Sequence, residues 1–163
     1  MKKTDDVAAL EKKLDAVLAT LLAASHGSRA TLRIDDAARG WHVDFICAEA
    51  VRPNVKSLRG DGSIDQRAAA TVHWLVKHKR NLVQPDLTDK PDPAPPPALM
   101  SAYAAKAQLL GPLLGSDDYL TGWISVHYVD GPHTFTADEE RAMDRAREEV
   151  SRLAGISSRE AAG

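Results

Sequence analysis

The sequence is short of cysteine and of net charge, and each shortage excludes a class of protein. Cys47 is the single cysteine among 163 residues, which rules out an internal disulfide framework and any metal site built from several cysteines. The formal net charge is −2, whereas a dedicated nucleic-acid-binding domain is normally strongly basic. We therefore expect no nucleic acid among its partners.

Long apolar runs are also missing. No stretch approaches the roughly 20 apolar residues that cross a bilayer, and acidic residues interrupt the N-terminal segment before a signal peptide could form. No polybasic cluster of the kind that binds anionic membrane surfaces is found. We expect a cytoplasmic protein that does not bind membranes.

The residues that are present have the balance of a globular domain, with 44% apolar and 27% charged. The length predicts a single domain over 1–163, with a core of about 5–153 and a flexible tail over 154–163. Six of the nine prolines lie in 85–98, yet neither side of that stretch has enough predicted elements to close its own core. We expect a rigid loop there rather than an interdomain linker.

Amphipathic helices are predicted at both ends of the chain. Apolar residues recur at three- and four-residue spacing over 5–24, where Thr4 or Asp5 can cap the start. Near the other end, Thr136 and Glu139 have the spacing of a capping box that opens a second striped helix. Such stripes can cover a sheet or pair with a second copy, so we also expect a homodimer through these helices.

Between these helices the sequence predicts a sheet and two further helices. The sheet pattern is a period-two alternation with turn residues between the strands. A capping box from Ser63 to Gln66 predicts a helix over about 64–78, and 98–105 predicts a short one. The predicted strands are 28–35, 40–50, 81–84, 107–114 and 119–129.

Three segments in the second half, taken in order, resemble the GAF family: HWLVKHKRNLVQPDLTD, AQLLGPLL and YLTGWISVHYVDGPHTFTADEERAMDRAREEVSRLA. They are similar to its helix and short strand ending in Asp, its strand ending in Pro-Leu, and its Gly-led strand before a Phe-Thr-x-x-Asp/Glu helix start. The resemblance runs from the first helix to about Leu153. It implies an α+β fold, a five- or six-stranded antiparallel sheet with the terminal helices on one face and a ligand pocket under shorter helices on the other.

Strand alternation selects the side chains that face this implied pocket. If Ile124 and Val126 face the terminal helices, their neighbours on the same strand face the pocket, and the same argument applies to the other strands. The candidate ligand-binding residues are Arg33, Asp44, Gln108, Trp123, Ser125 and His127. Their hydrogen-bond donors favour a small anion, and the tryptophan favours an aromatic or short aliphatic acid over an inorganic ion.

Each candidate also has an ordinary structural interpretation. Arg33 could form a structural ion pair with Asp44, and a strand histidine such as His127 is more often a hydrogen-bonded core or surface residue. Trp123 could simply pack. If side chains fill the pocket, the chain is a purely structural member of the family.

Other branches of the family use residues that do not match here. Free methionine sulfoxide reductases need a reactive and a resolving cysteine, and no cysteine lies near Ser101, where that branch carries its nucleophile. Bilin-binding members carry a cysteine in the second half, and the Asn-Lys-Phe-Asp set of cyclic-nucleotide binders is absent. We predict no enzymatic activity, with a reductase-like redox enzyme as the alternative.

Neither a cofactor nor a metal is predicted. Haem remains an alternative only through a histidine ligand, for which His73, His127 or His133 would serve. Three aspartates in the proline-rich stretch recur at every third residue but suit turn caps better than a cation site. The chain is therefore expected to be a small-molecule sensor that signals through a regulatory protein partner, because no output domain fits in the remaining residues.

Overall fold

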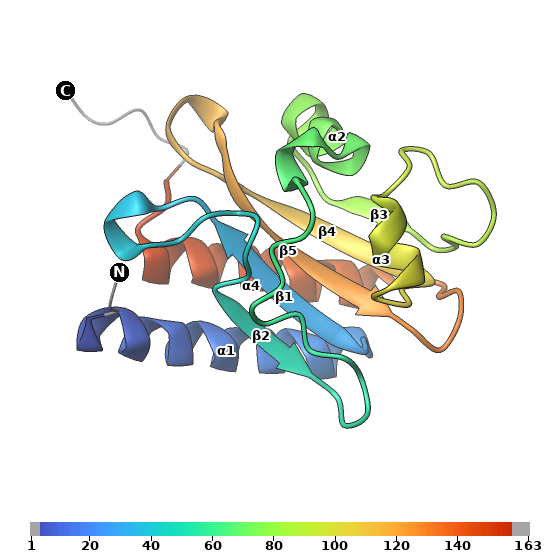
Figure 1. Cartoon of the computed structure of the whole chain (residues 1–163), viewed down its shortest axis with the longest axis horizontal. Helices are drawn as coiled ribbons and strands as arrows, with labels where there is room; N and C mark the ends of the chain where they lie inside the picture. Colours follow the sequence, from blue (N-terminus) through green and yellow to red (C-terminus); the bar gives the residue numbers. More distant parts are fainter. Residues whose placement is uncertain (1–3, 158–163) are drawn as a thin grey trace.

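One antiparallel sheet lies between two layers of helices and loops in the computed structural model, which describes residues 4–157 (Figure 1). The strands follow the spatial order β2-β1-β5-β4-β3. They are β1 (Arg29–Ile34), β2 (Ala48–Val51), β3 (Leu82–Gln84), β4 (Ala107–Leu114) and β5 (Leu120–Tyr128). The predicted α+β class and antiparallel sheet are confirmed, with five strands.

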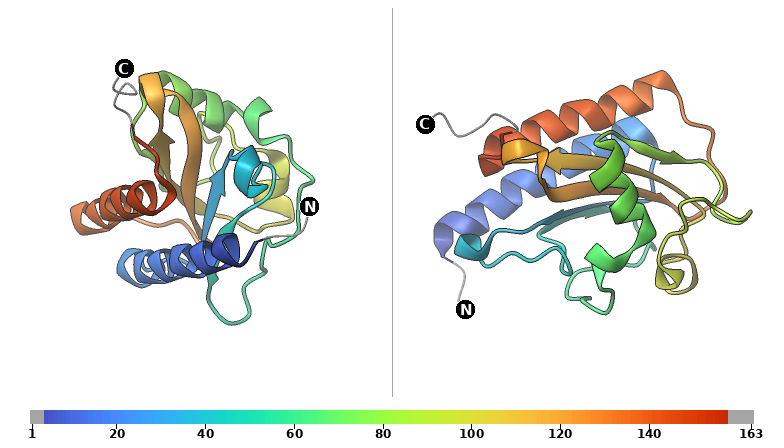
Figure 2. Two further views of the ribbon diagram at one scale, coloured as in Figure 1. Left: turned by 90° about the vertical axis from the view of Figure 1, so that its left-hand side faces the viewer. Right: turned by 90° about the horizontal axis from the view of Figure 1, so that it is seen from above.

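The two long helices cover one face of the sheet, and the short helices cover the other (Figure 2). Thr4 caps the first helix by accepting the Val7 N–H, and the capping box predicted at Thr136 and Glu139 forms at the start of the last. The long helices are α1 (Asp5–Ser25) and α4 (Ala137–Ala154), and the short ones are α2 (Ala70–His78) and α3 (Pro97–Ser101).

The main apolar core lies between the sheet and the long helices. Leu32, Leu109 and Val126 of three neighbouring strands are fully buried against Leu18 and Met143 of the two helices. This arrangement follows from the period-two and period-3.6 patterns, which put one apolar face on each element. The opposite face of the sheet is thereby left for the polar and aromatic side chains of the strands.

The strand predicted over 40–50 is wrong for most of its length, because β2 begins only at Ala48. Around Val43, two side chains bond to the backbone where a neighbouring strand would otherwise do so. One side chain comes from β1 and the other from the turn that follows it. Arg33 donates to the carbonyl oxygens of Val43 and Asp44, and Asp35 accepts the Val43 N–H. Residues 41–47 therefore form a loop in which side chains bond to the backbone groups of Val43 and Asp44, while other groups bond to backbone.

The helix predicted over 64–78 is shorter than expected. Ser63 does not cap it, because both its N–H and its hydroxyl donate to the carboxylate of Asp61. A single 3₁₀ turn over Gln66–Ala68 follows, and α2 begins after Ala69. The segment before α2 is consequently irregular.

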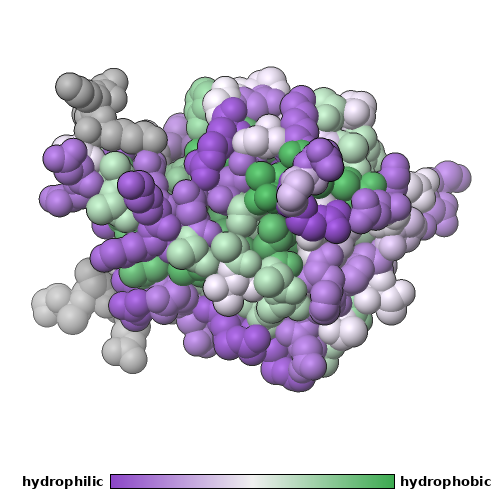
Figure 3. Space-filling view, turned by 90° about the horizontal axis from the view of Figure 1, so that it is seen from below, coloured by the Kyte–Doolittle hydropathy of each residue, from purple (hydrophilic) through white to green (hydrophobic). Residues whose placement is uncertain are grey.

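Two grooves flank α1 on the outside of the molecule. The α1–α4 groove, of about 660 Å³, contains Ala16, Thr20, Ala24 and Ala142 among its lining residues. The α1–β2 groove, of about 790 Å³, includes Ala19 among its lining residues. Figure 3 shows the molecule from below, where apolar surface lies between polar residues. Among the described residues, no helix is both long and apolar enough to cross a membrane.

The chain beyond α4 was predicted to be a flexible tail over 154–163. Gly155 ends the helix in a left-handed conformation, and Ile156 packs against the main core. The rest of the predicted tail, 158–163, lies outside the described residues.

Candidate functional site

Strand pairing builds a polar floor on the sheet face that points away from α1 and α4. Two neighbouring strands place polar residues directly opposite one another, with Thr31 across from Ser125 and Arg29 across from His127. The next strand places Gln108 opposite His127 as well. Because alternate residues of a strand share one face, these side chains all point to the same side.

Side chains from the short helices and from the loops close over this floor and leave a cavity of about 30 Å³. A space of that size holds about two or three water molecules. The lining residues from the sheet are Thr31, Arg33, Gln108, Leu110, Trp123, Ser125 and His127. The loops and short helices within 52–103 lie over the floor and are called the cover below. The cover lines the cavity with Leu58, Ile64, Gln66, Thr71, Val72, Pro96, Leu99 and Tyr103. The cavity thus brings together five of the six predicted site residues.

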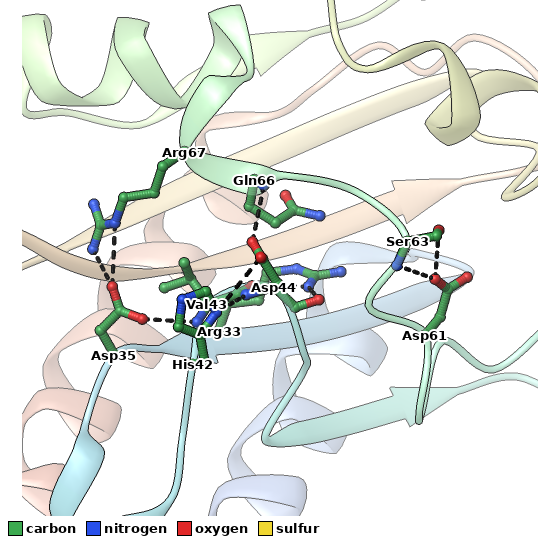
Figure 4. A network of polar contacts seen from close by, with 9 residues as sticks. All are labelled: Arg33, Asp35, His42, Val43, Asp44, Asp61, Ser63, Gln66 and Arg67. Atoms are coloured by element: carbon green, nitrogen blue, oxygen red, sulfur yellow. Dashed lines mark hydrogen bonds and ion pairs between the residues drawn. The ribbon is translucent and has the colours of Figure 1, made fainter.

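Arg33 is the charged group of the cavity wall. Its side chain is 4% exposed, and its Nη1 donates to the Val43 oxygen at 2.9 Å and to the Asp44 oxygen at 2.8 Å (Figure 4). Burial lowers the pKa of the guanidinium, but an arginine side chain remains charged in proteins. The site therefore holds a buried positive charge that rests on main-chain oxygens.

Asp44 supports the site differently from the prediction. It lies in the loop over 41–47 instead of on a strand, and its carboxylate accepts the Gln66 N–H at 3.0 Å (Figure 4). The same carboxylate lies 3.6 Å from His42 Nδ1. Arg33 contacts the main-chain oxygen of Asp44, so Asp44 positions the guanidinium and links it to the cover.

A second arginine, Arg67, lies beside the cavity-lining Trp123 and was not predicted. Its Nη2 donates to Asp35 at 2.6 Å and to the Leu120 oxygen at 3.0 Å. Its guanidinium also lies over the rings of Tyr119 and Trp123, at 5.3 and 5.9 Å from their centroids. Arg67 thus ties its segment to the end of β1 and the start of β5.

His127 is the buried imidazole of the floor. Its Nδ1 accepts a hydrogen bond from Arg29 Nε at 3.0 Å. Burial, followed by the charges of Arg29 and Arg33, lowers the pKa of His127 well below its usual range. The ring is therefore neutral at physiological pH.

Arg29 is the functional residue that sequence reasoning missed. It is fully buried, and beyond His127 it donates to the Lys56 oxygen at 2.9 Å and to the Tyr103 oxygen at 2.8 Å. Burial lowers the pKa of its guanidinium to about 10. The signal was available, since Arg29 continues the alternation of Thr31 and Arg33 by one step toward the N-terminus.

The remaining floor residues are held by short polar contacts. Gln108 Nε2 donates to Gln84 Oε1 at 2.7 Å, and Gln84 in turn donates to the Pro93 oxygen, which fixes both amides. Ser125 is 5% exposed and adds a hydroxyl to the cavity lining, whereas Trp123 supplies an apolar wall. The cavity therefore combines hydrogen-bond donors with the aromatic side chains of Trp123 and Tyr103.

Cys47 and the aspartates of the proline-rich stretch lie away from the cavity. Cys47 packs in the main core, and burial raises the pKa of its thiol to about 12, which disfavours the reactive thiolate. Asp86 caps a turn by accepting from the N–H and the hydroxyl of Thr88. In the part of the chain that the structure describes, no three His, Cys, Asp or Glu side chains group as a metal site requires.

Comparison with solved structures identifies the fold. The blue-light-absorbing form of the PixJ GAF domain of Thermosynechococcus elongatus superposes with a TM-score of 0.68 at 15% identity, over 95% of this chain and 92% of that one. A second structure of the cyanobacteriochrome receptor PixJ gives 0.64 at 21% identity, over 91% and 93%. The phycocyanobilin-bound GAF domain of a cyanobacterial phytochrome gives 0.66 at 18%, over 91% and 90%.

These likenesses show that the chain has the GAF fold, as the sequence resemblance implied. No family model and no curated protein matches the sequence itself.

Proposed function

We propose that this chain is a sensor domain that binds a small organic anion, a short-chain carboxylate above all, in the cavity between the sheet and the cover. The observation that carries this proposal is Arg33. Its guanidinium is buried in the cavity wall, and its hydrogen bonds within the described chain go to two main-chain oxygens. Within the described residues Asp44 and Asp61 act on this charge through space, and no carboxylate bonds to it directly. A buried charge without a directly bonded carboxylate favours an anionic ligand, because charge-assisted bonds to guanidinium are strong.

The size of the cavity limits the ligand. A volume of about 30 Å³ accommodates two or three atoms the size of water, which suits formate, and acetate requires a small outward shift of the surrounding side chains. An aromatic acid, which the sequence left open, requires the cover to move outward. We therefore favour the short aliphatic acids among the ligands predicted from the sequence.

The bilins carried by the structural neighbours do not fit the residues present here. A linear tetrapyrrole is far larger than the cavity of about 30 Å³. Cys47, the single cysteine, is buried in the core between the sheet and the long helices, on the opposite side of the sheet from the cavity. We therefore propose no covalent attachment of a bilin to this chain.

A structural domain with a filled pocket is the second candidate. It is favoured by the small cavity and by the two carbonyl oxygens that already stabilise Arg33. The two candidates differ in one measurable property, since only the sensor gains stability from a small acid. A redox enzyme is less well supported, because burial raises the pKa of the Cys47 thiol to about 12.

Signal output is proposed to run through the long helices. The core between the sheet and the helices includes Ile124 and Val126, which alternate along β5 with cavity residues Ser125 and His127. A ligand that shifts this strand would therefore move the surface on which α1 and α4 rest. A regulatory partner, or a second copy of the chain, would read that shift.

The test is a thermal-shift screen of the purified chain. Formate, acetate and benzoate are compared with methylamine and ethylamine at equal ionic strength. We expect acetate or formate to raise the melting temperature and the amines to leave it unchanged. In Arg33→Ala the acid should lose roughly 2–5 kcal/mol of binding free energy, as in truncation of one partner of a buried charge pair.

Arg67→Ala is the matched control. It removes a neighbouring guanidinium that does not line the cavity, so acid binding should persist. Stabilisation by amines, or equal stabilisation of the wild type and Arg33→Ala by acids, contradicts the anion site. No stabilisation by any compound supports the structural candidate instead.

A further inference from the structure

We propose that Arg29 is a positioning residue that locks His127 as the neutral tautomer with its proton on Nε2, so that the cavity presents a fixed hydrogen-bond donor. Arg29 lies outside the cavity, and we expect it to act on the ligand through the imidazole. The consequence for ligand choice rests on the proposed function. The tautomer itself is a property of the protein alone.

The chemistry of the pair determines the tautomer. A guanidinium carries only donors, so the Arg29 Nε–H at 3.0 Å from His127 Nδ1 requires a lone pair on that nitrogen. A neutral imidazole with a lone pair on Nδ1 has its proton on Nε2. Buried charges next to the ring oppose a second proton and thus keep it neutral.

The surroundings of Arg29 exclude a rearranged ring. Its two Nη atoms are fixed on the main-chain oxygens of Lys56 and Tyr103, so the position of Nε cannot adjust. Turning the imidazole over would place a C–H group where Nδ1 now accepts. A fully buried donor would then lose its partner, at the cost of an unsatisfied hydrogen bond.

The sheet register makes this lock part of the fold. Arg29 and His127 are directly paired residues of β1 and β5, so their side chains leave the same face at adjacent positions. His127 also lines the cavity, whereas Arg29 does not. Nδ1 is thus held by the neighbouring strand, and the remaining ring nitrogen is the polar atom that the side chain can offer to a ligand.

This donor sets the class of ligand. With Arg33 and the Nε2–H of His127 both donating, the cavity selects compounds that present unprotonated oxygen atoms and rejects those that present N–H donors. A carboxylate presents only acceptor oxygens and therefore suits either donor. Carboxamides of the same size present one acceptor and one donor group, so they should bind more weakly than the matching acids.

The experiment is long-range ¹H–¹⁵N correlation spectroscopy of the whole chain labelled at its six histidines. The His127 signal is assigned by its loss in His127→Gln. We expect a protonated Nε2 and an unprotonated Nδ1 in the wild type without any added ligand. A protonated Nδ1, or exchange between both tautomers, overturns the proposal whether or not any acid binds.

Two variants test the role of Arg29. Arg29→Met keeps the length of the side chain but cannot donate, so the His127 signal should change to a mixture of tautomers. Arg29→Lys keeps a donor and a charge and should restore the Nε2–H form. If Arg29→Met folds and its His127 tautomer is unchanged, the proposal is overturned. If Arg29→Met does not fold, the tautomer seen in the wild-type spectrum decides the proposal.

Ligand binding is tested separately with acetate and acetamide. At position 127, asparagine places its amide near the position of Nδ1 and offers no donor to the ligand. Glutamine is longer and can place an N–H near the position of Nε2. We expect His127→Asn to weaken acetate binding by roughly ten-fold or more, as for loss of a charge-assisted bond, and His127→Gln to weaken it less. Equal binding of acetate and acetamide contradicts donor selection. If neither compound binds while the Nε2–H tautomer is observed, the proposed function fails and the lock by Arg29 stands.

Discussion

Two buried arginines on the same strand have different tasks. Arg33 lies in the wall of the cavity and is held by main-chain oxygens of a loop. Arg29, four residues earlier, is held by two other main-chain oxygens and by an imidazole. Both charges act on His127, and their combined effect with burial holds the pKa of that ring well below its usual range. The histidine is therefore a hydrogen-bond donor that stays neutral. Keeping its ring neutral costs the folded state stability in acid.

This cost predicts a pH dependence of unfolding. Unfolded His127 takes up a proton below pH of about 6.5, whereas the folded ring does not until a much lower pH. The folded state thus binds fewer protons over that interval. The free energy of unfolding should fall by up to about 1.4 kcal/mol per pH unit as the pH drops below about 6.5, and its loss should end below the folded pKa.

The measurement is urea unfolding between pH 7.5 and pH 5, in the wild type and in His127→Gln. The difference between their free energies of unfolding should change with pH in the direction given above. His73→Gln, an exposed histidine of α2, is the control and should leave the slope as in the wild type. A pH-independent difference for His127→Gln would show that the folded ring titrates normally.

At the scale of elements, side chains rather than regular structure hold the cover in place. The buried carboxylate of Glu49 accepts from the Leu58 N–H at 2.7 Å and from the Ser57 hydroxyl at 2.5 Å. Asp35 and Arg67 join the next part of the cover to the sheet. Residues 52–65 of the cover form no helix or strand, and such a segment opens more readily than the sheet, as ligand entry to a closed cavity requires.

A similar anchor connects the ends of the long helices and predicts a stability effect. The carboxylate of Glu139, 2% exposed, accepts from the Thr136 N–H and lies 2.9 Å from ring nitrogens of His26 and His133. Glu139→Gln replaces one acceptor oxygen by a donor that faces an imidazole. We expect it to lower the free energy of unfolding by about 1–3 kcal/mol, measured by urea unfolding at pH 7.

Glu140→Gln provides the control for this prediction. It removes the same charge from the first turn of α4 but lies outside the contacts of Glu139 with the two imidazoles. Its effect should stay within a few tenths of a kcal/mol, as expected for a partly exposed charge near a helix start. Equal effects of both substitutions would mean that only the charge at the helix start matters.

At the scale of the whole molecule, we expect one face to bind a ligand and the opposite face to serve assembly. The cavity lies on one side of the sheet, and the α1–α4 groove lies beyond the long helices on the other. That groove is lined mainly by small and apolar residues, with charged residues at its rim. We keep the expectation that a second copy packs here, because two amphipathic helices offer a continuous stripe to a symmetry-related pair.

Sedimentation at micromolar concentration should show a dimer of the wild type. Thr20→Arg places a charged side chain at an exposed position of the α1–α4 groove and should shift the protein to a monomer without loss of folding. Ala19→Arg, also exposed but on the α1–β2 groove, should remain dimeric. A wild type that stays monomeric on concentration rules out this assembly.

The sequence by itself determined the elements whose patterns are local. Alternation of Ile124 and Val126 with Ser125 and His127 fixed the two faces of β5, and the capping box at Thr136 fixed the start of α4. These features depend on period and on residues three apart, which a single sequence displays. The resemblance of three segments to the GAF family implied the fold class and a pocket, and the alternation then selected the candidate residues, five of which line the cavity.

Tertiary structure alone decided which polar groups meet. Arg33 and Asp35 bind the backbone around Val43, so a pattern that alternates like a strand became a loop. Asp61 captures Ser63, so a sequence with the spacing of a capping box starts no helix. Arg29 finds His127 through a pairing 98 residues apart in the chain. Backbone groups accept any partner of suitable geometry, and only the folded chain determines which partner lies nearest.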